Sequence, residues 1–286
     1  MRRSASKTAA VGFLIGFALL ISGCGSVPPG TSAPPPQTSS SQAGPGASSS
    51  PSGDGSPTGA PSSRPPSSAP PSSQPPEQAA VDCKKLKCVA LTYDDGPSPE
   101  TTPQLLKILK KYKARATFFQ LGSLASQYPE LEKQIHELGS EVANHSWNHE
   151  TLSRLSSDGA ERNLTRATKA IEKGCGCKIT LMRPPGGSTD KSLDKTTKRL
   201  GLAEIMWDVD TRDWETLNTS STRRSALNAH RNQVVLMHDI HQPTIDAQDD
   251  VISGLQDKGY TLVTVSELLG KQAAPGTRYP KSWGSY

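Results

Sequence analysis

Short apolar runs alternate with amphipathic segments from residue 88 to residue 269, and this alternation limits the possible folds more than any other feature of the chain. Each run has the length of a β-strand, and the segment after it has apolar residues at helical spacing. Regular alternation of this kind indicates a parallel sheet with helices packed outside it, either doubly wound or closed into a barrel. The expected strands are 88–93, 116–121, 141–144, 180–183, 203–209, 233–237 and 261–265. The expected helices are 100–112, 129–138, 156–173, 191–200, 220–230, 247–258 and 266–269.

The beginning of the chain has the pattern of a leader rather than of a folded domain. Residues 1–24 contain a basic start, an apolar run over 9–22 and small residues before Cys24, which is the order of a secretory signal. The apolar run is too short to span a bilayer comfortably. Because Cys24 follows Ile-Ser-Gly, the end of the leader resembles a bacterial lipobox, whose cysteine is lipidated. The alternative is an ordinary cleaved signal with an incidental cysteine.

Residues 25–80 consist mainly of Pro, Ser and Gly and have almost no large apolar side chains. Such a segment cannot offset its ordering entropy by burial, so we expect a disordered, semi-stiff tether. The sequence then predicts a folded domain over 81–270 and a loose tail over 271–286. With Cys24 lipidated, the protein would be secreted and anchored to the outer face of the cell membrane, facing the cell wall.

Charge and cysteine usage narrow the possible partners. The formal net charge of the whole chain is +5, and part of it belongs to the leader, so the expected folded domain is only weakly basic. Such a domain is compatible with an anionic cell wall, and the sequence has no basic arm that would indicate a nucleic-acid partner. A secreted chain can form disulfides, and Cys83–Cys88 is the preferred bridge because it would clip the edge of the first strand. Cys175 and Cys177 would pair with each other or stay reduced. A thiolate metal site is disfavoured, since the histidine cluster lies far away in the sequence.

Polar residues that suit catalysis lie directly after the expected strands. The carboxyl ends of parallel strands share one rim, and active sites are built at that rim, so these residues are expected to meet. They are Asp94, Asp95, His145, His149, Arg183, Asp210, Asp213, Trp214, His238 and Asp239.

A metal site is expected around the two adjacent carboxylates. Asp94 and Asp95 would point to opposite faces of a strand, but the Gly-Pro turn after them can bring both together, and two close carboxylates repel each other unless a cation lies nearby. His145 and His149 are four residues apart, so on a helical turn they would face the same metal. With Asp95 they form a set that leaves room for water, as catalytic zinc requires, although non-haem iron accepts the same ligands. Taken separately, these residues could be a solvated turn and two unrelated surface histidines.

Three further residues have plausible roles beside this site. Asp213 is a potential partner of His238, because a carboxylate beside an imidazole raises its pKa and keeps it protonated as an acid. Arg183 is permanently charged and could pair with a carboxylate. The simpler alternatives are a structural histidine and a surface ion pair.

Together these segments resemble the polysaccharide deacetylases of carbohydrate esterase family 4, which share the NodB homology domain. The resemblance covers residues 88–269 and implies a distorted (β/α) barrel of about seven parallel strands with outer helices, and the removal of acetyl groups from acetylated sugars. It rests on five motifs in the family's order, which are Thr92-Tyr93-Asp94-Asp95-Gly96-Pro97, His145-Ser146-Trp147-Asn148-His149, Arg183-Pro184-Pro185-Gly186-Gly187, Asp213-Trp214 and Leu236-Met237-His238.

The resemblance also implies a role for each residue. Asp94 is the expected catalytic base, held by Arg183, and His238 is the expected general acid, tuned by Asp213. The expected metal ligands are Asp95, His145 and His149. The expected substrate-binding residues are Tyr93, Gly186, Trp214 and Leu236. Many family members have an aromatic residue at the position of Gly186, so substrate preference and groove shape can differ here, while the backbone N–H implied as an oxyanion donor is kept.

The expected metal is Zn²⁺, with Co²⁺, Ni²⁺ or Fe²⁺ as alternatives, and the expected state is a monomer. Because a lipoprotein on a stiff tether reaches the wall first, the expected substrate is the N-acetylglucosamine of peptidoglycan. Deacetylation of chitin or chito-oligosaccharides and acetylxylan esterase activity are alternatives within the class. A non-catalytic glycan- or metal-binding lipoprotein is the alternative outside it, and is disfavoured because base, ligands and acid are all present.

Overall fold

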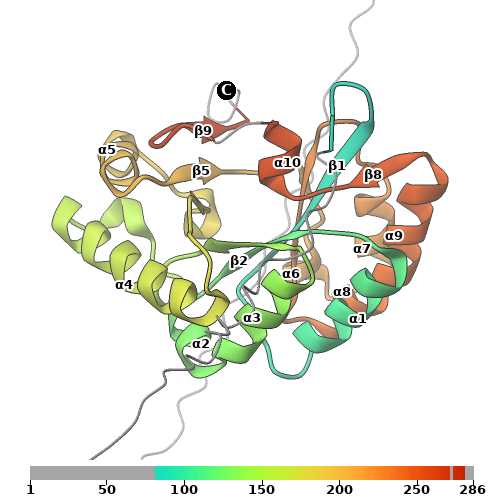
Figure 1. Cartoon of the computed structure of the whole chain (residues 1–286), viewed down its shortest axis with the longest axis horizontal. Helices are drawn as coiled ribbons and strands as arrows, with labels where there is room; N and C mark the ends of the chain where they lie inside the picture. Colours follow the sequence, from blue (N-terminus) through green and yellow to red (C-terminus); the bar gives the residue numbers. More distant parts are fainter. Residues whose placement is uncertain (1–80, 271–272, 281–286) are drawn as a thin grey trace, which may run out of the picture. The chain divides into compact units, whose positions relative to one another are not determined.

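The computed structural model describes residues 81–270 and 273–280 (Figure 1). The expected leader over 1–24, including Cys24, and the expected tether over 25–80 lie outside the described residues. Within the described part of the chain, no helix has both the length and the apolarity that a membrane span needs.

The described strands form one sheet in which every pairing is parallel, so the expected barrel with outer helices is confirmed. The strands are β1 (Lys87–Asp94), β2 (Thr117–Gln120), β3 (Glu141–Asn144), β4 (Leu181–Met182), β5 (Ala203–Ile205), β6 (Val209–Asp210), β7 (Val234–His238), β8 (Tyr260–Leu262) and β9 (Arg278–Tyr279). Neighbours run in the order β6-β7-β1-β2-β3-β4-β5-β9, and β8 pairs with the beginning of β1. No pairing among the described strands joins β6 to β9, so the barrel is open between them.

Helices follow most of the strands and pack around the barrel (Figure 1). Local sequence signals set their ends: Ser156 and Asp190 cap the starts of the two helices on one side of the barrel, and Gly176 and Gly201 end them in the left-handed conformation. The helices are α1 (Thr102–Tyr112), α2 (Gly122–Gln127), α3 (Pro129–Glu137), η1 (Leu152–Arg154), α4 (Ser157–Cys175), η2 (Pro185–Gly187), α5 (Lys191–Leu200), α6 (Asp213–Thr216), α7 (Thr219–Ala226), α8 (Gln242–Asp246), α9 (Gln248–Asp257) and α10 (Val265–Leu269).

Strand alternation divides the core into two apolar layers. Phe118 of β2 packs with Leu105 and Leu109 of α1 in the layer between sheet and helices. Its neighbour Phe119 points the other way and packs with Ile205 inside the barrel. Burying each of these side chains stabilises the fold by about 1.5–3 kcal/mol.

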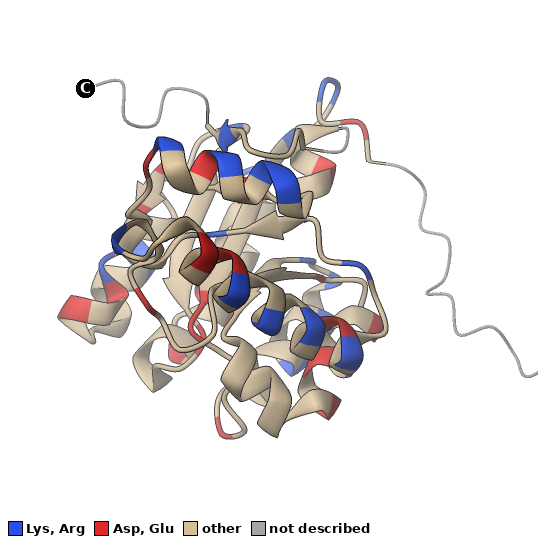
Figure 2. Cartoon of the chain, turned by 90° about the vertical axis from the view of Figure 1, so that its left-hand side faces the viewer, with Lys and Arg blue, Asp and Glu red and all other residues tan. Residues whose placement is uncertain are grey.

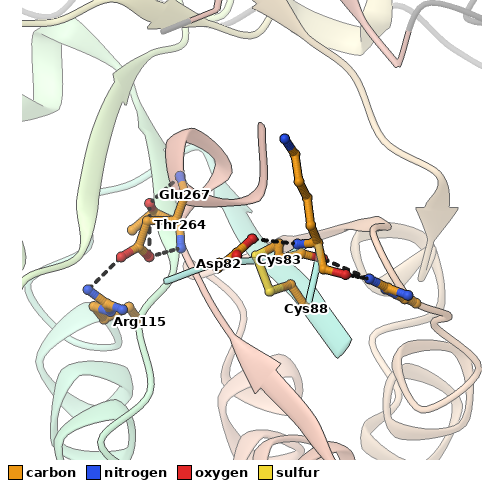
Figure 3. The surroundings of a disulfide bond; sticks show 8 residues. Asp82, Cys83, Cys88, Arg115, Thr264 and Glu267 are labelled. Carbon is orange, nitrogen blue, oxygen red and sulfur yellow. Dashed lines mark hydrogen bonds and ion pairs between the residues drawn. A yellow bond between two sulfur atoms is a disulfide. The ribbon is translucent and has the colours of Figure 1, made fainter. Parts of the chain in front are cut away.

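A disulfide joins Cys83 to Cys88 at the beginning of β1, as expected, with an S–S distance of 2.03 Å (Figure 3). Cys175 and Cys177 are also bonded to each other, which is one of the two alternatives left open by the sequence.

The end of the described chain differs from the prediction of a loose tail over 271–286. Arg278–Tyr279 form β9, which pairs in parallel with β5. Arg278 also forms a two-pronged ion pair with Asp194 of α5, with distances of 2.9 and 2.8 Å. The Gly/Pro/Ser-rich composition hid this strand, because two residues of edge strand are held by backbone hydrogen bonds and one arginine rather than by an apolar run.

Candidate active site

The two adjacent carboxylates at the end of β1 point into the same site. Asp94 is the last residue of the strand, and Asp95 has a φ of 73°, in the left-handed region that few non-glycine residues adopt. This conformation breaks the strand alternation. As a result, His145 Nε2 lies 3.7 Å from Asp94 Oδ2 and 3.4 Å from Asp95 Oδ1.

The turn after Asp95 is held against two buried polar side chains. A Cβ atom on Gly96 would lie 2.5 Å from Asp239 Oδ1 and 2.7 Å from Gln120 Oε1, so only glycine fits. Asp239 in turn accepts a hydrogen bond from the Thr102 hydroxyl at the start of α1. The ends of β2 and β7 and the first turn of α1 therefore fix the direction in which Asp95 points.

His145 and His149 converge, but not on a helix as the four-residue spacing predicted. They lie in a turn after β3, in which Ser146 and His149 have φ values of 72° and 63°. The two imidazole centroids are 5.2 Å apart. His145 Nδ1–H donates to the carbonyl oxygen of Arg183 at 2.8 Å, so Nε2 carries the lone pair that faces Asp95.

The donors of Asp95, His145 and His149 fit a divalent cation. One ligand atom from each lies within 4.8 Å of the others. Asp95 Oδ1 is buried without a hydrogen-bond partner among the described residues, and it lies 3.4 and 3.6 Å from the two imidazole Nε2 atoms. These separations are close to the edge of roughly 3.3 Å of a tetrahedron with metal–ligand bonds of about 2.0–2.1 Å. Burial also lowers the pKa of His145 to about 3, which keeps this imidazole in the neutral, metal-binding form.

Arg183 holds Asp94 from inside the barrel. Its fully buried guanidinium donates to Asp94 Oδ1 at 2.7 Å and to the Thr92 hydroxyl at 2.9 Å. The same group lies 4.1 Å from the centre of the Phe119 ring and donates to the carbonyl oxygen of Ile205. Burial raises the pKa of the Asp94 carboxyl, and the charge of Arg183 partly offsets that rise.

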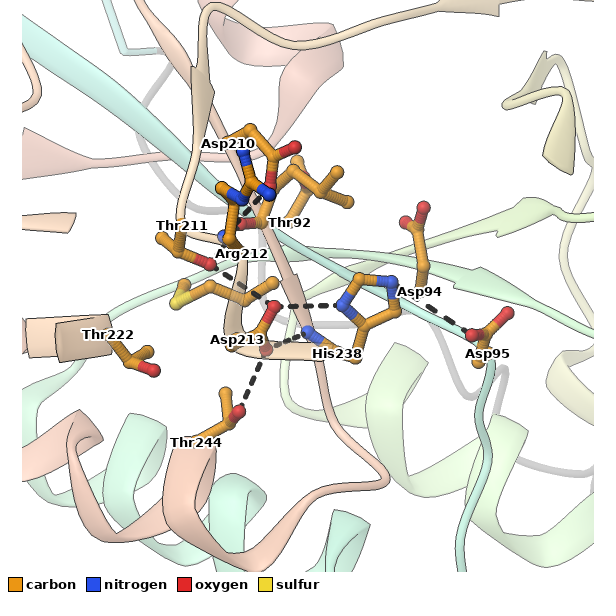
Figure 4. A network of polar contacts seen from close by, with 12 residues as sticks. Thr92, Asp94, Asp95, Asp210, Thr211, Arg212, Asp213, Thr222, His238 and Thr244 are labelled. Carbon is orange, nitrogen blue, oxygen red and sulfur yellow. Dashed lines mark hydrogen bonds and ion pairs between the residues drawn. The ribbon is translucent and has the colours of Figure 1, made fainter. Parts of the chain in front are cut away.

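His238 and Asp213 form a buried pair on the opposite side of the site (Figure 4). His238 Nδ1–H donates to Asp213 Oδ1 at 2.9 Å, and the His238 backbone N–H donates to Asp213 Oδ2 at 2.8 Å. Thr244 and Thr211 add two more hydrogen bonds to the same carboxylate. Burial alone would lower the pKa of His238, but the hydrogen bond and charge of Asp213, together with the nearby aspartates, raise it to about 9.

A cavity of about 370 Å³ joins these groups. It also contains Trp207, to which the sequence analysis gave no role, because the expected strand over 203–209 ran through this residue. Asp210 lines the cavity too, although the sequence placed it only at the rim. The residues that line it are Asp94, Asp95, His145, His149, Gly186, Trp207, Asp210, Trp214, Leu236 and His238.

The expected substrate-binding residues have different outcomes. Gly186, Trp214 and Leu236 line the cavity, and the Trp214 side chain is 50% exposed on the single turn of α6. Tyr93 does not, because it is 0% exposed and its hydroxyl donates to Gln248 in the layer between sheet and helices. The assignment of Tyr93 was wrong, since strand alternation directs it away from the face that carries Asp94.

A second, larger cavity of about 980 Å³ contains none of the predicted site residues. Its lining includes Cys83, just before β1, and Val234, at the start of β7. It therefore lies around the amino-terminal ends of the strands, and the smaller cavity at the carboxyl ends is the one with the chemical groups.

Comparison with known proteins agrees with this geometry. The family model described as polysaccharide deacetylase matches residues 82–205. A peptidoglycan-N-acetylglucosamine deacetylase of Bacillus cereus is 38% identical over 189 residues, which cover 64% of this chain and 88% of that protein. The chain belongs to the polysaccharide deacetylase family. The resemblance inferred from the five motifs is thereby confirmed, whereas the lipoprotein leader stays a prediction.

Other members of the family are similar over the same part of the chain. The peptidoglycan-N-acetylmuramic acid deacetylase PdaC of Bacillus subtilis is 43% identical over 183 residues, which cover 64% of this chain and 38% of PdaC. A solved structure described as T48 deacetylase with substrate superimposes with a TM-score of 0.67 and 38% identity, covering 70% of this chain and 100% of that one. The matched region thus spans about two fifths of PdaC, so this chain corresponds to only one part of that relative.

Proposed function

We propose that this protein is a metal-dependent hydrolase that removes N-acetyl groups from a cell-wall polysaccharide. The observation that carries the proposal is the arrangement around one cavity: a buried carboxylate held by Arg183, three side chains placed to hold a metal ion and an imidazole paired with Asp213. These are the base, the electrophilic site and the acid that amide hydrolysis requires.

The metal ligands and Asp94 are placed to activate a water molecule for attack on the acetyl group. A divalent cation bound by Asp95, His145 and His149 would lower the pKa of water and stabilise the negative charge that develops on the acetyl oxygen. Asp94 Oδ1 is engaged by Arg183, which leaves Oδ2 to take the proton of the attacking water. The water oxygen bonds to the acetyl carbon, and the N–H of Gly186 at the cavity wall would donate to the oxyanion.

His238 completes the reaction on the leaving-group side. Its Nδ1 is held by Asp213, so Nε2 faces the cavity and carries the proton for the departing amine. The carbon–nitrogen bond then breaks, and the products are acetate and the free amino sugar. Trp214 and Leu236 line the cavity where the acetyl methyl group would lie.

Zn²⁺ is the proposed metal, with Co²⁺, Ni²⁺ and Fe²⁺ as alternatives. Two imidazoles and one carboxylate at tetrahedral separations favour Zn²⁺ with an open position. The ligand set itself accepts the other divalent ions.

Peptidoglycan N-acetylglucosamine is the proposed substrate. Relatives named for this substrate include PgdA of Listeria monocytogenes, which is 39% identical over 197 residues that cover 42% of PgdA. PdaC is named for N-acetylmuramic acid, and a 32% identical protein of Azorhizobium caulinodans is named a chitooligosaccharide deacetylase. Chito-oligosaccharides and acetylated xylan are therefore the substrates to compare.

A non-catalytic glycan-binding protein is the second candidate. A solved structure of a family pseudoenzyme from Bacillus anthracis is 31% identical to this chain with a TM-score of 0.62, so silent relatives exist. The assembled base, metal site and acid described above favour activity.

The location is proposed from the sequence alone. The signal-like leader and Cys24 support a secreted, lipid-anchored monomer on the outer face of the membrane, facing the wall. No nucleic-acid partner is proposed.

Acetate release tests the function directly. We expect acetate from peptidoglycan glycan strands, weaker release from chito-oligomers and acetylated xylan, loss of activity with chelator, and recovery with added Zn²⁺. Absence of acetate from all three substrates with Zn²⁺ present would favour the non-catalytic alternative.

A further inference from the structure

Two helices on one side of the molecule carry several Lys and Arg residues that the proposed chemistry does not use, and these residues are blue on the ribbon in Figure 2. Along α4, basic residues recur at a spacing of four, three and four, which places them on one side of the helix, away from the buried Leu164 and Ala167. The same spacing recurs along α5, opposite the buried Leu193. The rows are Arg162, Arg166, Lys169 and Lys173 on α4, and Lys191, Lys195 and Lys198 on α5. We call these seven residues, all exposed, the basic strip.

Acidic neighbours on the same helices, which are Asp158, Glu161, Glu172, Asp190 and Asp194, offset only part of the charge of the basic strip. Glu161 is paired with Arg199 at 2.6 Å, and Asp194 is paired with Arg278. Asp190 caps its own helix, and Glu172 accepts the backbone N–H of Ile179. Within the described part of the chain, no residue of the basic strip has an ion pair.

The dimensions of the basic strip suit a linear partner. The row on α4 extends from Arg162 to Lys173, and the eleven rises between these two residues amount to about 16 Å. The end of α5 lies beside the first turns of α4, where Thr196 contacts Ser157 at 3.2 Å and Arg199 pairs with Glu161 at 2.6 Å, so the row on α5 leads into the beginning of the row on α4. An open, elongated surface of this kind matches a chain of regularly spaced anions better than a single small anion, which needs converging donors in a pocket.

The basic strip contacts the turn of the candidate metal site through Arg166. The Arg166 guanidinium lies 3.5 Å from the centre of the Trp147 ring, in the turn between His145 and His149. The Trp147 backbone N–H also donates to Asn163 of α4 at 2.9 Å. A polymer bound along the basic strip would therefore pass next to the turn that carries two metal ligands.

We propose that the basic strip binds a linear phosphodiester polymer of the cell envelope and holds the candidate active site against the glycan that carries this polymer. The binding stands on the charge distribution alone, whereas its purpose rests on the proposed deacetylase function. Local attachment raises the effective concentration of glycan at the cavity, so it lowers KM on wall material that retains the polymer and leaves kcat unchanged.

The test measures binding of the full chain to immobilised poly(glycerol phosphate), with dextran as the neutral polymer and phosphatidylglycerol vesicles as the rival anionic surface. The strip variant is Lys169→Gln/Lys173→Gln/Lys195→Gln/Lys198→Gln. The matched control removes the same charge elsewhere, as Lys84→Gln/Lys107→Gln/Lys110→Gln/Lys113→Gln. We expect the strip variant to bind the polymer about tenfold or more weakly, the control to stay within about twofold, and all binding to fade near 0.5 M salt.

Several results would overturn the proposal: equal loss in both variants, no loss in the strip variant, or loss of vesicle binding alone. Deacetylation of a short neutral chito-oligomer should be unchanged in the strip variant, because this substrate cannot reach the basic strip. If neither the wild type nor any variant releases acetate from any glycan, but the strip variant still binds poly(glycerol phosphate) more weakly than the control variant, the proposed deacetylase function is wrong and the proposed binding surface is supported.

Discussion

Replacing Asp213 by Asn separates the electrostatic role of this residue from a merely structural one. Asp213 raises the pKa of His238 to about 9, mainly through the hydrogen bond to Nδ1 and the carboxylate charge. An unperturbed histidine has a pKa of about 6.5, so the raised pKa of His238 corresponds to a few kcal/mol, on the order of 3, in favour of the protonated imidazole. Burial of His238 opposes protonation, and this effect remains when the charge of Asp213 is removed.

The loss of this charge changes activity most at alkaline pH. An acid with a raised pKa is active below that pKa and is lost as the pH rises through it. At pH 8 about 90% of His238 is protonated with a pKa of about 9, and about 3% with a pKa near 6.5, a difference of roughly thirtyfold. Near pH 6 the same difference is less than about twofold. A bound dication lowers the pKa of His238 in the wild type and in the Asp213→Asn variant alike. The prediction therefore concerns the separation between the pH profiles of these two proteins.

The assay is the pH dependence of kcat/KM for acetate release from a chito-oligomer. We expect the alkaline limb of Asp213→Asn to lie about two pH units lower than that of the wild type. Thr244→Val is the matched control, because it removes one donor to Asp213 and leaves the carboxylate charge in place. An unmoved alkaline limb, or the same loss at every pH, would refute the reasoning.

Two further substitutions test the end of β1. Asp94→Asn removes the base but keeps the side-chain volume beside Arg183, so kcat should fall about 10²–10⁴-fold. The affinity for Zn²⁺, measured by calorimetry, should change little. Loss of metal binding would contradict the separate roles of Asp94 and Asp95. Gly96→Ala places a methyl group 2.5 Å from Asp239 Oδ1, so the turn must shift. The variant should still fold but bind Zn²⁺ about tenfold or more weakly. An unchanged affinity for Zn²⁺ would show that the turn does not position Asp95.

The sequence predicted the barrel and most of the site because both depend on local patterns. Short apolar runs place the strands, amphipathic segments place the helices, and parallel strands bring their carboxyl ends together. The convergence of Asp94 and Asp95 followed from one glycine and one proline. What the pattern did not show is that Asp95 itself adopts the left-handed conformation.

The errors come from backbone geometry that spacing alone does not report. His145 and His149 are four apart, which matches a helix, yet left-handed residues in a turn bring them together instead. Tyr93 belonged to a motif, but its direction depends on strand alternation, which points it into the core. Trp207 had no signal, because only the break between β5 and β6 exposes it to the cavity.

The bridge between Cys83 and Cys88 also decides how the domain responds to mechanical force. A pull on the chain that precedes Asp82 passes through the covalent bond to Cys88 and so bypasses the segment between the two cysteines. The force then runs along β1, whose backbone is bonded to β7 on one side and to β8 and β2 on the other. Under a pull directed along β1, these bonds lie across the force and must yield together rather than one at a time. The strand that ends in the two carboxylates is therefore also the part of the barrel best placed to resist tension.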